Sequence, residues 1–386
     1  MINKNFTKIR ILIDILLKSQ FTYKKPKLNP IAIFGGRGDA ATIFFDYVDK
    51  SKTTVLNLVT DEISLYIVWL CIIKNKSYYQ EYVDYLNPQI LLTFYDNSTA
   101  FLFIKAPREC CKISVQNGAR SELHDLFSSF TTIKKNILSN DYIFVFNDAV
   151  AKEYNKFIPC QSYSIGSFRS NRIKVLNIEK ELDILYVSTY REWYSIPNQD
   201  IVEGVTWGEY IKNELIFIRW LFRYASKNNI KLNIIGSSAV HSVKEYDFYQ
   251  ELSNGTMVNF IPKVKNRDTY KIIDSAKMIV SIDSTLGYEA LARGLRVAMV
   301  AGIRGNKYPL NSRRFGGPKI YPDTGNFWEV SLDKNKWNRV LDYTYTSSEE
   351  TWGDNFPLIN DVMKYNDQNK KFSDVIDKVL TGGGRF

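Results

Sequence analysis

The sequence predicts an α/β protein made of two successive Rossmann-like domains that face each other across a cleft. Short apolar segments alternate with helical segments along most of the chain, which is typical of a doubly wound parallel sheet. A polar, charged stretch at 170–181 interrupts this alternation, which then restarts. The length of 386 residues and the apolar content of 45% suit two or three domains with full hydrophobic cores.

These observations divide the chain into three parts. We expect an N-terminal domain at 1–175, a C-terminal domain at 176–345 and a helical segment at 346–386. The last segment is acidic and rich in turns, and it contains a helix expected at 372–380. In two-domain proteins of this shape, such a helix often packs back on the first domain.

The first half begins with an apolar strand at 30–34, a glycine turn at 35–38 and a helix at 40–47. The apolar run Leu65–Ile73 fits a buried helix or strand, and it is too short to span a bilayer. The further strands expected in this half lie at 54–59, 89–94, 112–115 and 142–146.

The second half repeats the pattern and contains a long amphipathic helix at 209–226. Its expected strands lie at 182–187, 232–235, 257–261, 278–282 and 295–300.

Composition narrows the function classes. The net charge of +10 fits nucleic acid, anionic lipid or an acidic substrate, or a composition that is simply rich in lysine. No zinc finger, RNP motif or basic helix occurs, so we expect no nucleic-acid partner. The four cysteines show no CxxC spacing, and there are only two histidines. We therefore expect no disulfide framework, no metal and no cofactor, and a reducing, cytoplasmic compartment.

Apolar residues repeat at helical spacing from Phe6 to Leu17, and several lysines follow. Asp14 within the apolar part and the missing small-residue cleavage site argue against a secretory signal. The segment fits either a helix on a membrane surface or a helix packed on its own domain. The inner membrane surface is thus one candidate partner.

The most informative segment is 280–294, VSIDSTLGYEALARG. A buried strand ends there at a Ser/Thr-rich loop, and a helix begins at once. Ser284 or Thr285 can cap this helix, and the exposed N–H groups then form a site for one phosphate. Glu289 lies about one turn along, where its carboxylate can reach ribose hydroxyls. The alternative is an ordinary strand–helix corner with a capped helix.

The STLGYEALARG segment resembles the donor-binding loop of GT-B glycosyltransferases, most of all those that build bacterial capsule and O-antigen. Weaker agreement comes from TFYDN at 93–97, QNGAR at 116–120 and GNFW at 325–328. The resemblance implies a nucleotide-sugar donor bound by the C-terminal domain. It also implies a glycan or lipid-linked glycan acceptor bound by the N-terminal domain.

Two aspartates are candidate general bases for the acceptor hydroxyl. Asp39 follows the glycine turn, whose spacing matches neither GxGxxG nor a Walker motif. In a GT-B arrangement this loop faces the cleft, so Gly36 and Arg37 are expected to contact the acceptor. The alternative for Asp39 is that it only caps the next helix and is not a base. Asp96 is the rival, because it follows the third strand at the carboxyl edge of the sheet.

Further acceptor-side candidates follow the third and fourth strands. Asn97 is expected to bond a sugar hydroxyl, unless it only forms a turn. Asn117 and Arg120 lie in the loop after the fourth strand, where the guanidinium can pair with a carboxylate or phosphate. Glu122 and His124 are lower-ranked bases.

Loops after the strands of the second domain are expected to border the same cleft. Their hydroxyls and backbone amides suit a phosphate, and Arg191 can neutralise charge on the leaving group. The alternatives are turn hydroxyls and solvated basic side chains. The donor-side candidates in these loops are Ser188, Thr189, Arg191, Gly236, Ser237 and Lys263.

We therefore expect a metal-independent glycosyltransferase that extends a surface polysaccharide at the cytoplasmic membrane face. Resemblance to capsule transferases that use CMP-activated 3-deoxy-ulosonic acids makes CMP the first donor nucleotide to test; UDP and GDP remain open. Two other functions stay open as well. One is a teichoic-acid-type polyol-phosphate transferase, against which the small number of histidines argues. The other is a non-catalytic subunit of a polysaccharide assembly complex.

Overall fold

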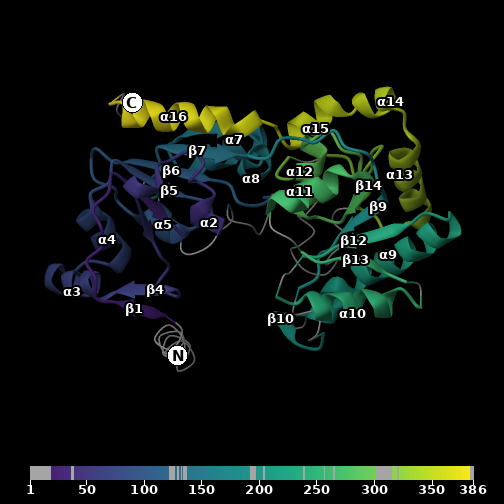
Figure 1. The fold of residues 1–386 in the computed structure, drawn as a ribbon, viewed down its shortest axis with the longest axis horizontal. Coiled ribbons are helices and arrows are strands. Elements are labelled where there is room, and N and C mark those ends of the chain that lie inside the picture. Colours follow the sequence, from purple (N-terminus) through teal and green to yellow (C-terminus); the bar gives the residue numbers. More distant parts are fainter. Residues whose placement is uncertain are drawn as a thin grey trace.

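The structure is a computed structural model, and its elements are labelled in Figure 1. Two parallel sheets with helices around them form two domains, as the sequence predicts. The residues that the structure describes are 19–35, 39–120, 127, 130, 131, 133, 137–191, 197–202, 205–237, 240–255, 257–263, 266–300, 315–319 and 321–382.

The N-terminal sheet has six parallel strands in the order β3-β2-β5-β6-β7-β8. Because all six run the same way, their carboxyl ends lie along one edge of the sheet. The sequence did not predict β8, because the segment QSYS is polar and partly exposed. The strands are β2 (Ile31–Phe34), β3 (Thr53–Leu56), β5 (Ile90–Thr93), β6 (Cys111–Val115), β7 (Tyr142–Val145) and β8 (Gln161–Ser164).

The C-terminal sheet has five parallel strands in the order β13-β12-β9-β14-β15. Two small pairs lie outside the main sheets: β1 (Gln20–Thr22) with β4 (Glu62–Ser64), and β10 (Asp200–Val202) with β11 (Val205–Thr206). The strands of the sheet are β9 (Leu182–Val187), β12 (Leu232–Ile235), β13 (Asn259–Ile261), β14 (Ala276–Ser281) and β15 (Val297–Met299).

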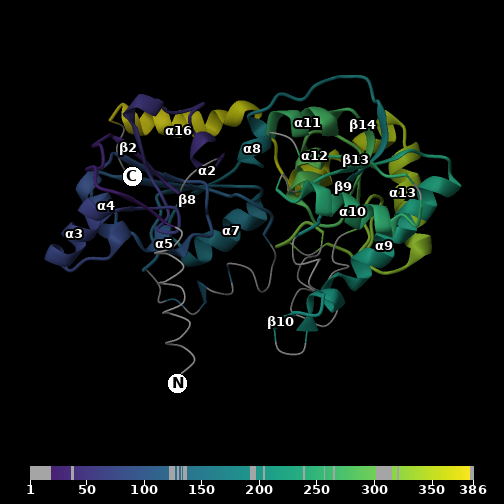
Figure 2. The ribbon, with the colours of Figure 1, turned by 60° about the horizontal axis from the view of Figure 1, so that its bottom comes forward.

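Helices connect the strands and cover the sheets (Figures 1 and 2). The longest of the described helices, α9, begins with a reciprocal capping box between Thr206 and Glu209, which satisfies two backbone N–H groups at its start. In the first domain the helices are α2 (Asp39–Thr42), α3 (Leu65–Lys74), α4 (Tyr78–Leu86), α5 (Thr99–Phe103), α7 (Asp148–Phe157) and α8 (Phe168–Asn171), with the short 3-10 helix η1 (Lys50–Lys52). In the rest of the chain they are α9 (Trp207–Lys227), α10 (Ser242–Leu252), α11 (Asn266–Asp274), α12 (Thr285–Ala292), α13 (Lys334–Thr346), α14 (Glu349–Gly353), α15 (Phe356–Val362) and α16 (Lys370–Leu380), with η4 (Asp367–Asn369).

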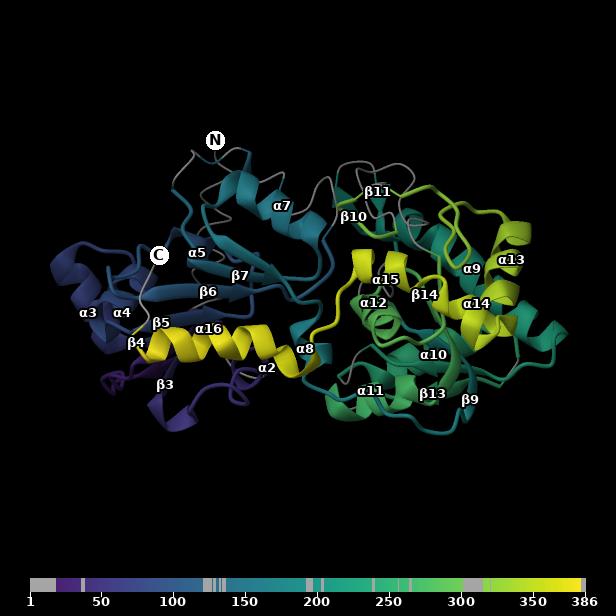
Figure 3. The same ribbon diagram turned by 90° about the horizontal axis from the view of Figure 1, so that it is seen from above.

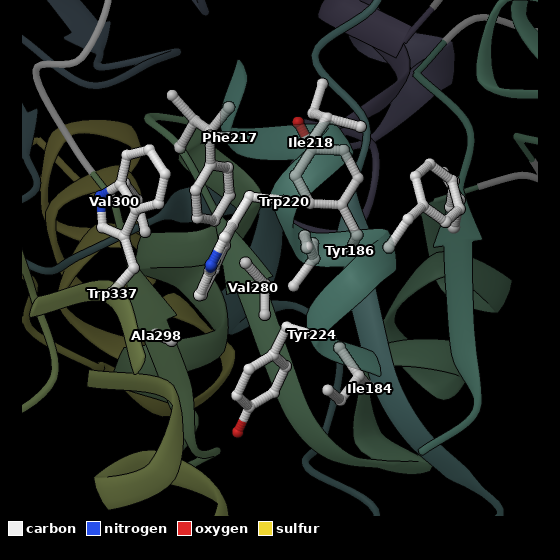
Figure 4. Packing of buried hydrophobic residues seen from close by; sticks show 14 of the residues in the cluster. Ile184, Tyr186, Phe217, Ile218, Trp220, Tyr224, Val280, Ala298, Val300 and Trp337 are labelled. Atoms are coloured by element: carbon white, nitrogen blue, oxygen red, sulfur yellow. The ribbon is translucent and has the colours of Figure 1, made fainter. Parts of the chain in front are cut away.

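Each sheet separates two hydrophobic cores, because successive side chains of a strand point to opposite faces. In β14, Met278 and Val280 pack on one side of the C-terminal sheet, while Ile279 packs on the other. Figure 4 shows the first of these cores, where Trp220 and Trp337 of the covering helices lie 5.1 Å apart between ring centroids. Burial on both faces explains why these strands are mostly apolar instead of alternating apolar and polar residues.

Helix α3 differs from the expectation of a buried apolar element. Its residues Ile67 and Leu70 are buried, but Trp69, Ile72 and Ile73 are each more than half exposed. The run is apolar on all sides of the helix, so its hydrophobicity does not reveal which side faces solvent.

The last helix, α16, lies on the N-terminal domain, so the chain returns to the first domain after α13, α14 and α15 (Figures 1 and 3). Phe372 is fully buried there. Its ring centroid lies 5.8 Å from that of Phe44, 5.1 Å from that of Phe144 and 4.8 Å from that of Phe168. This aromatic cluster joins the end of the chain to the sheet that begins it.

Replacing Phe372 with Ala is expected to lower the free energy of unfolding of the N-terminal domain by about 3–5 kcal/mol, because it removes a fully buried ring. Leu380 on the same helix is 40% exposed, so Leu380→Ala serves as the control, with an expected loss of about 0.5 kcal/mol or less. Urea unfolding measures the free energy of unfolding of both variants. Equal losses in the two variants would mean that α16 does not belong to the core of this domain.

Candidate functional site

A cavity of ≈ 430 Å³ lies between the two domains, where the carboxyl ends of their parallel strands converge. We call it the interdomain cavity. This is the edge at which open α/β sheets bind ligands, because the loops and helix N-termini there converge from several strands. Residues after β6 and β7 and from α8 line its N-terminal side, including 116–120, Phe146, Asn147 and Arg169. Loops after β9, β12, β13 and β14 line its C-terminal side, including 187–189, Gly236, Ser237, Lys263 and 283–286.

The start of α12 faces the interdomain cavity. Ser284 caps the helix, since its hydroxyl accepts a hydrogen bond from the N–H of Leu286 at 3.3 Å. The Thr285 hydroxyl accepts a hydrogen bond from the backbone N–H of Ala119, in the other domain, at 3.2 Å. A Cβ at Gly287 would overlap the Ser281 side chain, so glycine lets this helix lie close against β14. The helix start is therefore fixed between the domains, with the positive end of its dipole toward the cavity.

Glu289, on the first turns of α12, is buried and lines the interdomain cavity. Ser167 of the N-terminal domain donates a hydrogen bond to its Oε1, and Tyr270 of α11 donates one to its Oε2 at 2.8 Å. Burial raises the pKa of Glu289, and these two donors with the charges of Arg169 and Arg293 oppose the rise. A carboxylate has about four acceptor positions, so two bonds leave capacity for a ligand hydroxyl.

The hydroxyls of Ser188 and Thr189 turn into the C-terminal domain rather than outward. Ser188 donates to buried Glu245, and Thr189 donates to buried Glu214. Glu245 also accepts a hydrogen bond from the backbone N–H of Ser237 at 2.8 Å. One carboxylate thus ties the loop after β9 to the loop after β12, and both loops line the cavity with their hydroxyls already engaged.

Gly236, Arg191 and Lys263 complete the donor-side candidates, and all three line the interdomain cavity. A Cβ on Gly236 would lie 3.0 Å from the Phe260 ring and 3.1 Å from the backbone nitrogen of Lys263, so the loops pack tightly here. Arg191 and Lys263 are exposed, and Arg191 donates a hydrogen bond to the carbonyl of Tyr190 at 2.7 Å. Both cations lie at the solvent side of the cavity.

Asp96 is fully buried and is not among the residues that line the interdomain cavity. Its carboxylate accepts hydrogen bonds from the Nε and Nη2 of Arg120, from the backbone N–H of Asn117 at 3.2 Å and from the hydroxyl of Tyr154. Burial and the charge of Asp96 raise the pKa of Tyr154. A fully buried carboxylate that already accepts four hydrogen bonds and does not line the cavity is poorly placed to take a proton from an acceptor hydroxyl, so this geometry suits a positioning residue rather than a base.

Asn117 and Arg120 line the interdomain cavity, and Arg120 also donates a hydrogen bond to the Asn117 side chain at 3.0 Å. Asn97 is exposed and does not line it. Four other predicted residues, Gly36, Arg37, Glu122 and His124, lie outside the described residues. The side chain of Asp39 lies outside them as well. The backbone of Asp39 begins α2, directly after β2.

Sequence reasoning missed Arg169 and Tyr270, which both line the interdomain cavity. Arg169 belongs to the four-residue helix α8, which overlaps the start of the predicted linker at 170–181 and shows no apolar period. The sequence offered one local signal for this helix, Ser167, which precedes Phe168 and Arg169 and can cap a helix N-terminus. Tyr270 lies within α11, and nothing in the local sequence sets it apart from a core tyrosine.

Two searches of the described part of the chain gave no result. No group of three or more His, Cys, Asp or Glu side chains there is arranged to hold a metal ion. Among the described helices, none is both long and apolar enough to cross a bilayer.

Residues 113–380, more than half of the chain, match the family model described as "putative O-antigen biosynthesis protein". The chain belongs to this family. The matched region includes the loop after β6, the whole C-terminal domain and α16. No curated protein matches the chain by sequence.

Solved structures share the fold at low sequence identity. The wall teichoic acid polymerase TagF, in its H548A form, is 12% identical with a TM-score of 0.50 over 99% of each chain. A co-structure of Staphylococcus aureus MnaA with UDP is 13% identical with a TM-score of 0.50, over 94% of this chain and 97% of that one. Sucrose-phosphate synthase from Thermosynechococcus elongatus is 13% identical with a TM-score of 0.46, over 97% of this chain and 93% of that one. The expected GT-B fold, two Rossmann-like domains facing across a cleft, is confirmed.

Replacing Asp96 with Ala is expected to lower the free energy of unfolding by about 3–5 kcal/mol, because it leaves Arg120 buried without its partner. The control is Asp46→Ala, which breaks an exposed ion pair with Arg172 and is expected to cost about 1 kcal/mol or less. The double variant Asp96→Ala/Arg120→Ala should recover part of the loss, since it removes the uncompensated charge. Denaturant unfolding measures all three, and a stable Asp96→Ala variant would contradict the described pairing.

Proposed function

We propose that this protein is a glycosyltransferase that moves a sugar from a nucleotide-sugar donor to a growing bacterial surface polysaccharide. The observation that supports it best is the interdomain cavity, to which each domain presents the carboxyl ends of its strands. The start of α12 lies in this cavity with a carboxylate, Glu289, one turn along. Membership in an O-antigen biosynthesis family agrees with a surface polysaccharide as the product.

In this proposal the C-terminal domain binds the donor. The N-terminus of α12 stabilises the phosphate of the leaving nucleotide, and Glu289 accepts a hydrogen bond from the ribose. Arg191 and Lys263 add positive charge at the solvent side, so the transfer needs no metal ion in this account. CMP remains the first nucleotide to test. UDP is the leading alternative, since MnaA, which shares the fold, has been solved with UDP; GDP follows.

The N-terminal domain binds the acceptor in the same proposal. Asp39 begins α2 at the carboxyl end of β2 and remains the candidate base, whereas Asp96 positions Arg120 and the loop after β6. Deprotonation of the acceptor hydroxyl lets its oxygen attack the anomeric carbon, and the bond to the nucleotide phosphate breaks. The acceptor is a glycan or a lipid-linked glycan.

Nucleotide binding tests the donor half of the proposal. CMP, CDP, UDP, GDP and ADP are added to the purified protein, and its melting temperature is measured. A ligand at 100 times its dissociation constant stabilises the native state by about 2.7 kcal/mol, which corresponds to a rise of a few degrees. Glu289→Gln is expected to reduce the shift. The control Glu329→Gln changes a buried carboxylate of the same domain outside the cavity, and it should leave the shift unchanged.

Measuring turnover with the same purified proteins distinguishes a glycosyltransferase from the two alternative functions. Asp39→Asn is expected to keep the nucleotide-induced shift and to lose activity by about 10²–10⁴-fold, as for removal of a general base. A phosphodiester product would instead indicate a teichoic-acid-type transferase. If no nucleotide shifts the melting temperature, the donor site is absent and a non-catalytic subunit becomes the better account.

We also propose that the protein binds the membrane surface through α3 and the segment beside it. Trp69, Ile72 and Ile73 expose apolar area on α3, and β1 packs against this helix. The lysine-rich segment after β1 runs along it, since Lys25 Nζ lies 5.0 Å from the ring centroid of Tyr66. Figure 1 shows α3 at the end of the molecule far from the C-terminal domain. Exposed aromatic and aliphatic side chains beside lysines fit an anionic lipid surface.

The triple variant Trp69→Ala/Ile72→Ala/Ile73→Ala is expected to sediment about tenfold less with vesicles that contain anionic lipid, because it removes the inserted apolar area. Added salt should also weaken vesicle binding by the wild-type protein, because it screens the charges of the lysines. Val243→Ala/Met257→Ala is the control, because it removes two apolar side chains on the other domain that are also more than half exposed. Equal sedimentation of all three proteins would exclude α3 as the contact.

A further inference from the structure

Arg169 reaches the interdomain cavity from the N-terminal domain. It lies on α8, whose start is capped by Ser167, the residue that also donates to Glu289. Figures 1 and 3 show α8 at the boundary between the two domains. Its side chain lines the cavity and is partly buried.

In the part of the chain that the structure describes, no carboxylate forms an ion pair with the guanidinium of Arg169. Its carbon Cζ lies over the Phe94 ring, 5.3 Å from the centroid. Its Nε is buried, and among the described residues no atom accepts a hydrogen bond from it. By contrast, Arg120 pairs with Asp96, and Arg293 pairs with Asp274. Buried donors are normally satisfied, so a guanidinium held by stacking at a cavity wall is arranged for a partner that the described residues do not supply.

The charges around the cavity favour an anion as that partner. The described cations that line it are Arg120, Arg169, Arg191 and Lys263, and the described carboxylates are Asp283 and Glu289. The charge of Arg120 is compensated by Asp96 behind the wall, and the Glu289 carboxylate already accepts two hydrogen bonds. The remaining balance is positive, and a guanidinium binds phosphate or carboxylate oxygens in a fixed, bidentate geometry.

We propose that Arg169 binds an anionic oxygen group of the molecule in the interdomain cavity, either a phosphate of the nucleotide or a carboxylate of an acidic sugar. This inference rests on the proposed function, because it assumes that a donor enters the cavity. It adds a contact from the acceptor domain to a ligand that the C-terminal domain binds. The donor would then touch both domains, and Arg169 would select donors by their negative charge.

A structural role predicts a different pattern. The charge of Arg169 opposes the burial that raises the pKa of Glu289, so removing Arg169 could act on the ligand through Glu289 alone. Glu289 is proposed to bind the ribose, which a nucleoside and its nucleotide share. An effect through Glu289 would therefore weaken both to the same degree. Direct binding of a phosphate would weaken only the nucleotide.

The experiment compares Arg169→Ala, Arg169→Lys and the control Arg172→Ala by titration calorimetry. Arg172 directly follows α8, and it pairs with exposed Asp46 outside the cavity. The probes are CMP and UDP, the nucleosides cytidine and uridine, and a free 3-deoxy-ulosonic acid. We expect Arg169→Ala to lower the affinity for the anionic probe that Arg169 contacts, a nucleotide or the ulosonic acid, by about 10- to 100-fold. This is the usual effect of losing a charge-assisted hydrogen bond. Arg169→Lys should recover part of the affinity, and Arg172→Ala should match the wild type.

The outcomes separate the two sources of the anion. A loss confined to CMP or UDP, with nucleosides unchanged, supports a phosphate. A loss confined to the ulosonic acid supports a sugar carboxylate. Equal losses for nucleosides and nucleotides, or no loss in Arg169→Ala, would overturn the proposal while the proposed function stands. A wild type that binds the ulosonic acid but no nucleotide would contradict the proposed donor site alone, and a wild type that binds no probe would contradict both.

Discussion

The buried carboxylate of Glu289 is the interaction on which the rest of the site depends. It accepts one hydrogen bond from Ser167 of the first domain and one from Tyr270 of the second, so a single side chain joins the two. Burying a carboxylate is unfavourable unless donors surround it, which is why these partners converge on it. The bond from Ala119 to Thr285 joins the domains a turn away. Together these contacts hold the start of α12 opposite the loop after β6.

Other buried carboxylates organise the cavity wall from behind. Asp96 fixes Arg120 and Asn117 on the N-terminal side, and Glu245 fixes the loops after β9 and β12 on the other. These acids do not contact the cavity themselves, yet they determine which backbone groups and side chains do. A wall built this way is preorganised, so a bound nucleotide would meet groups already in place.

The sequence predicted the parts of the structure that depend on local patterns. Short, mostly apolar segments marked the central strands, and Ser284 in the Ser/Thr-rich loop after one of them marked the capped start of α12. The edge strand β8 was missed because its residues are polar. The exposed side of α3 was missed because apolar residues surround the whole helix.

The direction of side chains in the site could not be predicted, because it depends on distant partners. Ser188 turns inward to Glu245, 57 residues further along the chain, and Thr189 turns to Glu214, 25 residues further. Asp96 looked available as a base at the edge of its sheet, but Arg120 and Tyr154 enclose it. The position of the Arg169 guanidinium at the cavity wall is visible only once the two domains are placed together.

The most direct test of the donor site is a crystal structure of the protein with the nucleotide that it binds most tightly. We expect a phosphate oxygen about 3 Å from the backbone N–H of Thr285, at the start of α12, and a ribose hydroxyl at a similar distance from Glu289. A nucleotide bound outside the interdomain cavity, or one whose phosphate lies away from α12, would contradict the proposed donor site.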